Sequence, residues 1–160
     1  MALSIAITIS IILLHLSIFQ HSKHSFLDNS IVFFVVSIFI MNYLTIIAWN
    51  KEFIAVSTDD SLFVSFLLHR NLITPLLIVL FANTFRKQKG VLVKVGLLAS
   101  TLLIMYLFNF GSVYFDVENY KEWNLLLASM MDFIVLTIGV VTLHFVVFLK
   151  TKETQNYGGL

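Results

Sequence analysis

The sequence predicts an all-α membrane protein, a bundle of five transmembrane helices, and three observations support this fold class. Hydrophobic residues make up 59% of the chain and charged residues only 12%, whereas soluble globular domains carry about 25% charged residues. Five apolar runs are each long enough to cross a hydrocarbon core of about 30 Å. Of the charged residues, only Arg70, Lys94 and Asp132 lie well inside these runs.

The first two runs cover residues 3–20 and 30–49. A cleaved signal peptide would begin with basic residues and end with a small-residue cleavage site. The first run has neither, so we expect it to remain as a helix. The second run follows Asp28 and Asn29, residue types that cap helix N-termini. It ends at Trp49, an aromatic residue of the kind that gathers at membrane–water interfaces.

The other three runs cover residues 61–85, 90–111 and 123–149. The third run begins after Asp59 and Asp60, again suitable capping residues. All connections between the runs are short, and no linker or repeat interrupts them. We therefore predict one five-helix domain within residues 1–152, followed by a short cytoplasmic tail at 153–160.

Basic residues in the connections predict the orientation. With five crossings, one side collects six basic residues and the other collects two. The first set is Lys23, Arg86, Lys87, Lys89, Lys150 and Lys152, and the second is Lys51 and Lys121. Because Lys and Arg accumulate in cytoplasmic loops, we expect the N-terminus outside and the C-terminus in the cytoplasm. The Ile- and Phe-rich composition favours the plasma membrane of a bacterium.

Two buried charges of opposite sign are the strongest candidates for a site. Arg70 lies nine residues into the third run and Asp132 nine residues into the fifth. A helical rise of 1.5 Å per residue places both roughly 14 Å below the outer helix ends. Each charge alone would cost about 2.5–3.5 kcal/mol on insertion scales. We therefore predict an ion pair between them.

Further polar residues lie at similar depth. His69 and Asn71 flank Arg70, and Asn42 lies about 10 Å from the outer end of the second run. Pro75 frees the carbonyl four residues before it and can kink the helix. These observations predict a ligand or ion-pair cluster in the outer half, formed by Arg70, Asp132, His69, Asn71 and Asn42. The alternative is that these polar contacts only hold the helices together.

The connection over residues 112–122 is predicted to be an extramembrane loop. Its aromatic residues Tyr114, Phe115 and Tyr120 are expected at the membrane interface, where aromatic belts form.

Enzyme motifs are not found in the sequence. It lacks a serine-hydrolase elbow, a zinc-protease motif, a phosphate-binding loop and a dinucleotide fingerprint. Cysteine is absent, which excludes thiol chemistry and disulfides. We therefore predict no catalytic residue, no metal site and no cofactor. No basic stripe suggests nucleic acid, so the expected partners are the lipid bilayer and either another membrane protein or a second copy of this chain.

These features favour a small accessory, interaction or sensor-type membrane subunit. One alternative is a small transporter or permeation subunit that uses the Arg/His/Asp cluster to hold an anion or relay a proton. Because five crossings are few for an alternating-access monomer, this alternative requires an oligomer. An enzyme that acts on a lipid or quinone is a third hypothesis.

Overall fold

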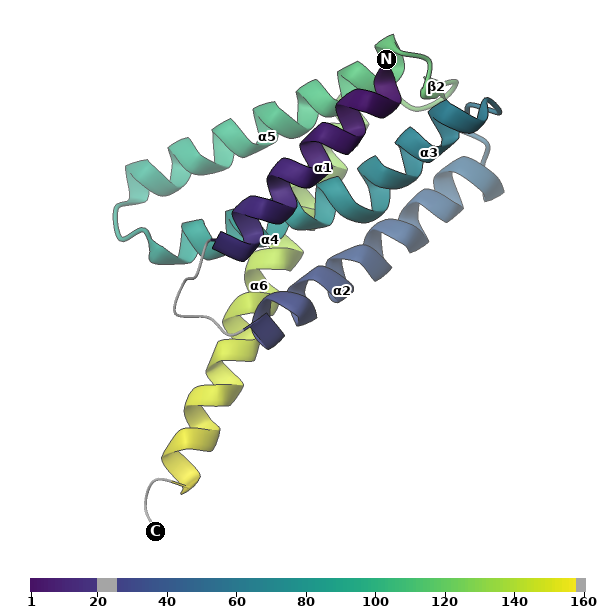
Figure 1. The fold of residues 1–160 in the computed structure, drawn as a ribbon. Helices are drawn as coiled ribbons and strands as arrows, with labels where there is room; N and C mark the ends of the chain where they lie inside the picture. The colour runs from purple at the N-terminus through teal and green to yellow at the C-terminus, as the bar shows by residue number, and fades with distance from the viewer. Residues whose placement is uncertain (20–25, 158–160) are drawn as a thin grey trace.

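Five long helical segments make up the computed structural model, which describes residues 1–19 and 26–157 (Figure 1). In chain order the elements are α1 (Ala2–Phe19), α2 (Phe26–Leu44) with the π-helix η1 (Thr45–Asn50), α3 (Asp60–Leu68) with the π-helix η2 (His69–Ile73) and α4 (Thr74–Lys87), α5 (Val91–Tyr114) and α6 (Leu125–Tyr157). Four segments are long and apolar enough to cross a membrane: Phe26–Asn50, Asp60–Lys87, Val91–Tyr114 and Leu125–Lys152. Helix α1 is a shorter apolar helix. The predicted all-α membrane class is therefore supported.

Helix bounds differ from the prediction mainly at the ends. Helix α2 begins at Phe26, and α6 continues to Tyr157, so most of the predicted tail is helical. The predicted end of the first helix at Gln20 and the basic residue Lys23 lie outside the described residues, as do residues 158–160 of the predicted tail.

Asp28 is not the helix cap that the sequence suggested, because it lies inside the first turn of α2. Its carboxylate accepts hydrogen bonds from Lys150 Nζ at 2.8 and 3.1 Å. This ion pair joins the start of α2 to α6, and the Asp28 side chain is only 3% exposed. A buried carboxylate needs such a partner to offset its lost hydration.

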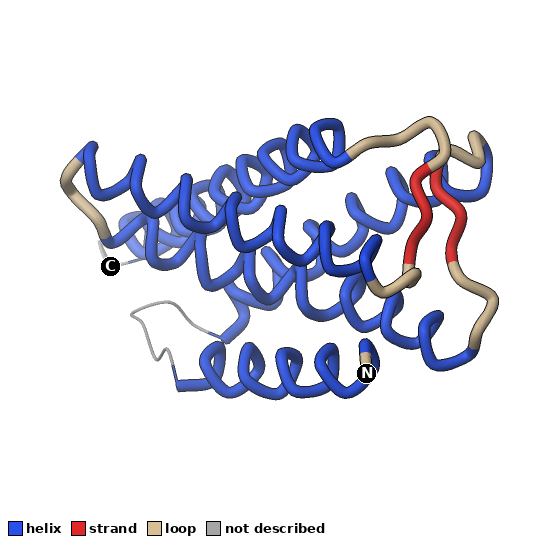
Figure 2. Tube along the Cα trace, turned by 90° about the horizontal axis from the view of Figure 1, so that it is seen from above, coloured by secondary structure: helices blue, strands red, loops and turns tan. Residues whose placement is uncertain are grey.

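A two-stranded antiparallel sheet lies where only loops were predicted. Strand β1 (Ile54–Val56) pairs with β2 (Glu118–Tyr120), with Ile54 opposite Tyr120 and Val56 opposite Glu118. Since strand side chains alternate between faces, these four residues point to one side. Ile54 and Glu118 are buried, so that side faces the helices. The strands lie at one end of the bundle, opposite the α4–α5 turn (Figure 2). We call these the sheet end and the turn end.

A proline explains the π-helix between α3 and α4. Pro75 lacks an N–H, and its ring would clash with the carbonyl of Asn71 four residues earlier. The chain accommodates this with one wide turn, in which the Thr74 N–H donates to the carbonyl of His69, five residues back. The Thr74 hydroxyl donates to the same carbonyl at 3.0 Å. The backbone N–H and the hydroxyl of Thr74 therefore both donate to the His69 carbonyl, where the α-helical hydrogen bonding is interrupted.

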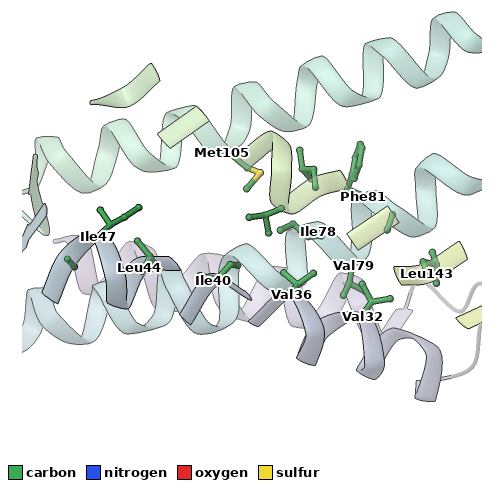
Figure 3. Close-up of a cluster of buried hydrophobic side chains, with 14 of the residues drawn as sticks. Val32, Val36, Ile40, Leu44, Ile47, Ile78, Val79, Phe81, Met105 and Leu143 are labelled. Atoms are coloured by element: carbon green, nitrogen blue, oxygen red, sulfur yellow. The ribbon is translucent and has the colours of Figure 1, made fainter. Parts of the chain in front are cut away.

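Helix α2 contributes a buried stripe to the main core (Figure 3). Val32, Val36, Ile40 and Leu44 recur every fourth residue, the spacing of one helix face. Partners from α4 and α6 pack against this stripe, among them Ile78, Val79, Leu136 and Leu143. Many apolar side chains on the other helix faces are exposed, as expected where lipid replaces water. The core thus holds α2, α4 and α6 together.

Gly139 lets α6 approach α4 and α2 closely. A Cβ atom added there would overlap Cγ2 of Ile78 and lie 3.7 Å from Cγ2 of Val36. Small residues serve this purpose at membrane helix interfaces. We predict that Gly139→Ala lowers the free energy of unfolding in detergent by about 1–3 kcal/mol, because overpacking displaces the helices.

The matched control is Gly96→Ala, since a Cβ added to Gly96 meets nothing within 4 Å. Alanine is the better helix former by up to about 1 kcal/mol, so this variant should be unchanged or more stable. Equal stability of the two alanine variants would contradict the close helix contact.

Candidate functional site

A small polar cavity lies near the sheet end, with a volume of about 30 Å³. By the same measure of cavity volume, one water molecule needs about 10–15 Å³. The cavity therefore has room for one or two waters. Its polar lining comes from α2, η2, α4, α5, α6 and β2. These side chains are Tyr43, His69, Arg70, Thr74, Asn109, Glu118, Tyr120 and Asp132. Two carboxyl groups and one guanidinium thus share one enclosed space.

The Arg70 guanidinium is held mainly by helix α2. Its Nη2 donates to the carbonyl oxygen of Met41 at 2.8 Å and to Oγ1 of Thr45 at 3.4 Å. Its carbon Cζ lies 5.2 Å from the ring centre of Trp49 and 5.7 Å from that of Phe66. Both distances are within the range of cation–π attraction. The charge is therefore stabilised by a carbonyl and two aromatic faces.

The predicted ion pair between Arg70 and Asp132 is not formed. Both side chains line the cavity and both are buried, but the guanidinium turns toward α2. Asp132 instead accepts a hydrogen bond of 2.8 Å from Nδ2 of Asn109 on α5. Helical rise predicted correctly that the two residues come close enough to line one cavity, but rise along a helix does not determine which neighbour each side chain faces.

His69 joins the cavity, whereas the two other predicted residues do not. The His69 ring lies 3.3 Å, measured from Nδ1, from the hydroxyl oxygen of Ser112 and 5.9 Å, edge to face, from the ring of Phe108. Asn42 is exposed and donates to the carbonyl of Ile38 in its own helix at 2.7 Å. Asn71 does not line the cavity. Neighbouring helical residues point in different directions, which separates Asn71 from His69 and Arg70.

Two buried polar atoms of η2 have no hydrogen-bond partner. Among the residues that the structure describes, no acceptor meets buried Nε of Arg70 and no donor meets buried Oδ1 of Asn71. A buried polar group without a partner costs about 1–3 kcal/mol. The Arg70 side chain lines a polar cavity with room for water, so the oxygen of a water there has the acceptor capacity that the Nε–H group needs.

The prediction missed Glu118 and Tyr120, because it assigned both to an extramembrane loop. Glu118 is 6% exposed and faces the cavity from the first position of β2. Tyr120, expected in an interfacial belt, lies on the same strand face and donates from its hydroxyl to the Glu118 carboxylate. One signal was present in the sequence, since the two residues are spaced by two, as on one face of a strand.

The electrostatics of the cavity act on Glu118. Burial raises its pKa to about 7, and the negative charge of Asp132 adds to the rise. The hydrogen bond from Tyr120 and the positive charge of Arg70 oppose it. Burial also raises the pKa of Tyr120, with the charge of Glu118 adding to it, so its hydroxyl keeps its proton. The cavity therefore contains a carboxyl group that changes charge near neutral pH.

The donor set of the cavity suits protons and water better than a metal ion. Within residues 1–19 and 26–157, no group of three or more His, Cys, Asp or Glu could hold a metal ion. Comparisons with protein families, characterised proteins and solved structures found no match for this chain.

We predict that the chain becomes less stable as pH rises from about 4.5 to 7. The unfolded Glu118 ionises near the ordinary value of 4.5, whereas the folded one keeps its proton up to about 7. Protonation therefore stabilises the folded state below 4.5, and this contribution is lost as pH passes through 7. The loss is on the order of 3 kcal/mol.

Thermal unfolding in detergent from pH 4.5 to 8 measures this effect. Glu118→Gln should flatten the dependence, because glutamine resembles the protonated carboxyl group. Glu122→Gln is the matched control, since Glu122 follows the same strand but is exposed. If the stability of the Glu118→Gln variant depended on pH as that of the native chain does, Glu118 would not be the source of the pH dependence.

Proposed function

We propose that this chain is a non-catalytic, sensor-type membrane subunit that crosses a bacterial plasma membrane five times and responds to protons on the outer side. The proposal has two parts, the topology and the response. Each rests on a different observation and each has its own experiment.

The position of α1 supports the fifth crossing. Its 18 residues span roughly 27 Å at 1.5 Å per residue, close to the hydrocarbon thickness of about 30 Å. Ala2 packs with Phe66 and Val117 at the sheet end, and Leu13 packs with Ile73 and Leu76 farther along the bundle. Helix α1 therefore runs alongside the bundle rather than across one of its ends (Figure 1).

The distribution of basic residues supports an outward-facing sheet end. The turn end carries Arg86 and Lys87 in the last turn of α4 and Lys89 just after it, whereas the sheet-end connections carry Lys51 and Lys121. Basic residues favour the cytoplasm in short loops, so the turn end is assigned to the cytoplasm. The polar cavity would then lie in the outer half of the membrane.

Single-cysteine labelling tests the topology, and the absence of native cysteine makes it clean. We expect a membrane-impermeant maleimide to label intact cells carrying Lys121→Cys or a cysteine inserted after Met1. Lys89→Cys should react only after lysis. Labelling of Lys89→Cys and Lys121→Cys from the same side would refute the bundle orientation, and labelling of the inserted cysteine only after lysis would refute the fifth crossing.

The single observation that carries the proposed response is the composition of the cavity. Arg70, Asp132 and Glu118 line a cavity of about 30 Å³. This cavity has room for water but not for a metabolite. A transported solute or an enzyme substrate would need a larger space. A group that titrates near neutral pH and links the sheet to the helices suits a proton-dependent switch.

In this proposal, strand β2 links the protonation of Glu118 to a change in conformation. When Glu118 and Asp132 are both ionised, their two negative charges share the cavity with one guanidinium, that of Arg70. Because Glu118 belongs to β2 and Asp132 to α6, their repulsion acts between the sheet and the bundle. The sheet should therefore close on the helices at acidic pH and loosen at alkaline pH, and a partner at the outer surface could read this difference.

Trp123 provides a probe of the response, because its side chain lines the cavity. In a Trp49→Phe background it is the sole tryptophan. We expect its emission in reconstituted membranes to titrate with a midpoint near pH 7, because Glu118 changes charge there. Adding Glu118→Gln should abolish the transition, and adding Glu122→Gln should leave it in place. An unchanged transition in the Glu118→Gln chain would refute the proton response.

A further inference from the structure

A second, larger cavity lies between α1 and α5 and is separate in character from the polar one. It is a groove of about 240 Å³. Ala2 and Ala6 form part of the α1 wall, Gly111 and Ser112 part of the α5 wall, and His69 and Ile73 part of the floor. Small residues on both walls leave the space open. A Cβ atom added to Gly111 would meet nothing within 4 Å.

The lining of this groove favours an uncharged ligand. No Lys, Arg, Asp or Glu lines it, and its surface is mainly aliphatic and aromatic. A phosphate or ammonium headgroup would lose its hydration there without an opposite charge to replace it. The groove therefore suits a neutral molecule rather than the headgroup of a phospholipid.

Hydrogen-bonding capacity is concentrated at one place in the groove. Ser112 Oγ lies 3.3 Å from Nδ1 of His69, and one hydrogen bond between them leaves Nε2 of the imidazole for another partner. The hydroxyl of Ser65 is already used, since it donates to the carbonyl of Ser61 at 2.8 Å. The groove thus offers a hydrogen-bonding imidazole–hydroxyl pair within an otherwise apolar wall.

Aromatic side chains beside this pair favour a flat ligand. Phe108 and Phe115 line the groove, and the Phe108 ring meets the His69 ring edge to face. Flat rings pack well in such a slot. Sites for whole drug-sized molecules enclose about 300–1,000 Å³, so about 240 Å³ suits one ring and the first part of a chain, while the rest of the molecule extends into the bilayer.

We propose that this groove binds the ring of a membrane quinone, with a ring carbonyl hydrogen-bonded at the His69–Ser112 pair and the hydrocarbon tail leaving between α1 and α5. A quinone combines the required features, namely an uncharged flat ring, carbonyl acceptors and a long apolar tail. Because the imidazole of His69 also lines the polar cavity, the bound ring would lie next to the proton-responsive site. Binding is the whole proposal, and no electron transfer is included.

The test measures the thermal unfolding midpoint of the full chain in detergent against increasing concentrations of a decyl-substituted benzoquinone. A ligand that binds only the folded state raises this midpoint, and the stabilisation grows with the logarithm of one plus the ratio of the ligand concentration to its Kd. Decylbenzene, which has the ring and the tail but no carbonyl group, is the control ligand. We expect the quinone to raise the midpoint and decylbenzene to have no effect at equal concentration.

Substitutions on α5 locate the site. Gly111→Leu should occupy part of the groove, because a Cβ atom at this position meets nothing within 4 Å, and should raise the quinone concentration needed for a given shift at least tenfold. Gly96→Leu makes the same change at another open position of α5 and should behave as the native chain. Ser112→Ala should weaken binding several-fold, because it removes the hydroxyl beside His69.

Three results would overturn the proposal. An equal shift with decylbenzene would show that the groove accepts any hydrocarbon, such as a lipid tail. Equal affinity in the Gly111→Leu and Gly96→Leu chains would place the quinone elsewhere. No shift with the native chain would exclude binding. None of these readouts uses the emission of Trp123, so quinone binding and the proton response can fail separately.

Discussion

The need to satisfy one buried guanidinium inside an apolar bundle dominates the organisation of the sheet end. No water is available in the hydrocarbon core, so polar groups must find partners within the protein. Arg70 finds a carbonyl on α2 and the faces of Trp49 and Phe66. The wide turn imposed by Pro75 places this arginine in a π-helix, a feature that is frequent at functional sites. Helix α2 and the α3–α4 segment are thereby held together beside the polar cavity.

The small sheet connects this intramembrane arrangement to the outside of the bundle. Strands β1 and β2 come from two connections far apart in sequence, yet their inward face supplies Ile54, Glu118 and Tyr120 to the cavity. The proposed charge change on Glu118 would therefore act where the sheet meets the helices. His69 lines both the polar cavity and the apolar groove, so the proposed proton site and the proposed quinone site share a side chain and are candidates for energetic coupling.

The spacing of residues along the helices predicted some parts of the candidate site but not others. Equal helical rise placed Arg70 and Asp132 at one level, and they do line one cavity. Their expected ion pair was wrong because rise fixes height but not the direction of a side chain around the helix. The burial of Glu118 could not be predicted, for a different reason. Its burial depends on pairing with β1, a contact between residues about sixty positions apart, which leaves almost no local trace in the chain.

Composition and the spacing of charges were sufficient to predict a helical membrane protein and the approximate extent of its long apolar segments, because hydrocarbon penalises every unpaired polar group along a span. Local chemistry also predicted the break at Pro75, since a missing N–H acts within one turn. The sheet, the choice of α2 as the partner of Arg70, and the groove between α1 and α5 required the folded structure. Each of these depends on how separate helices rotate and approach, and that is set by packing between elements rather than by any single segment.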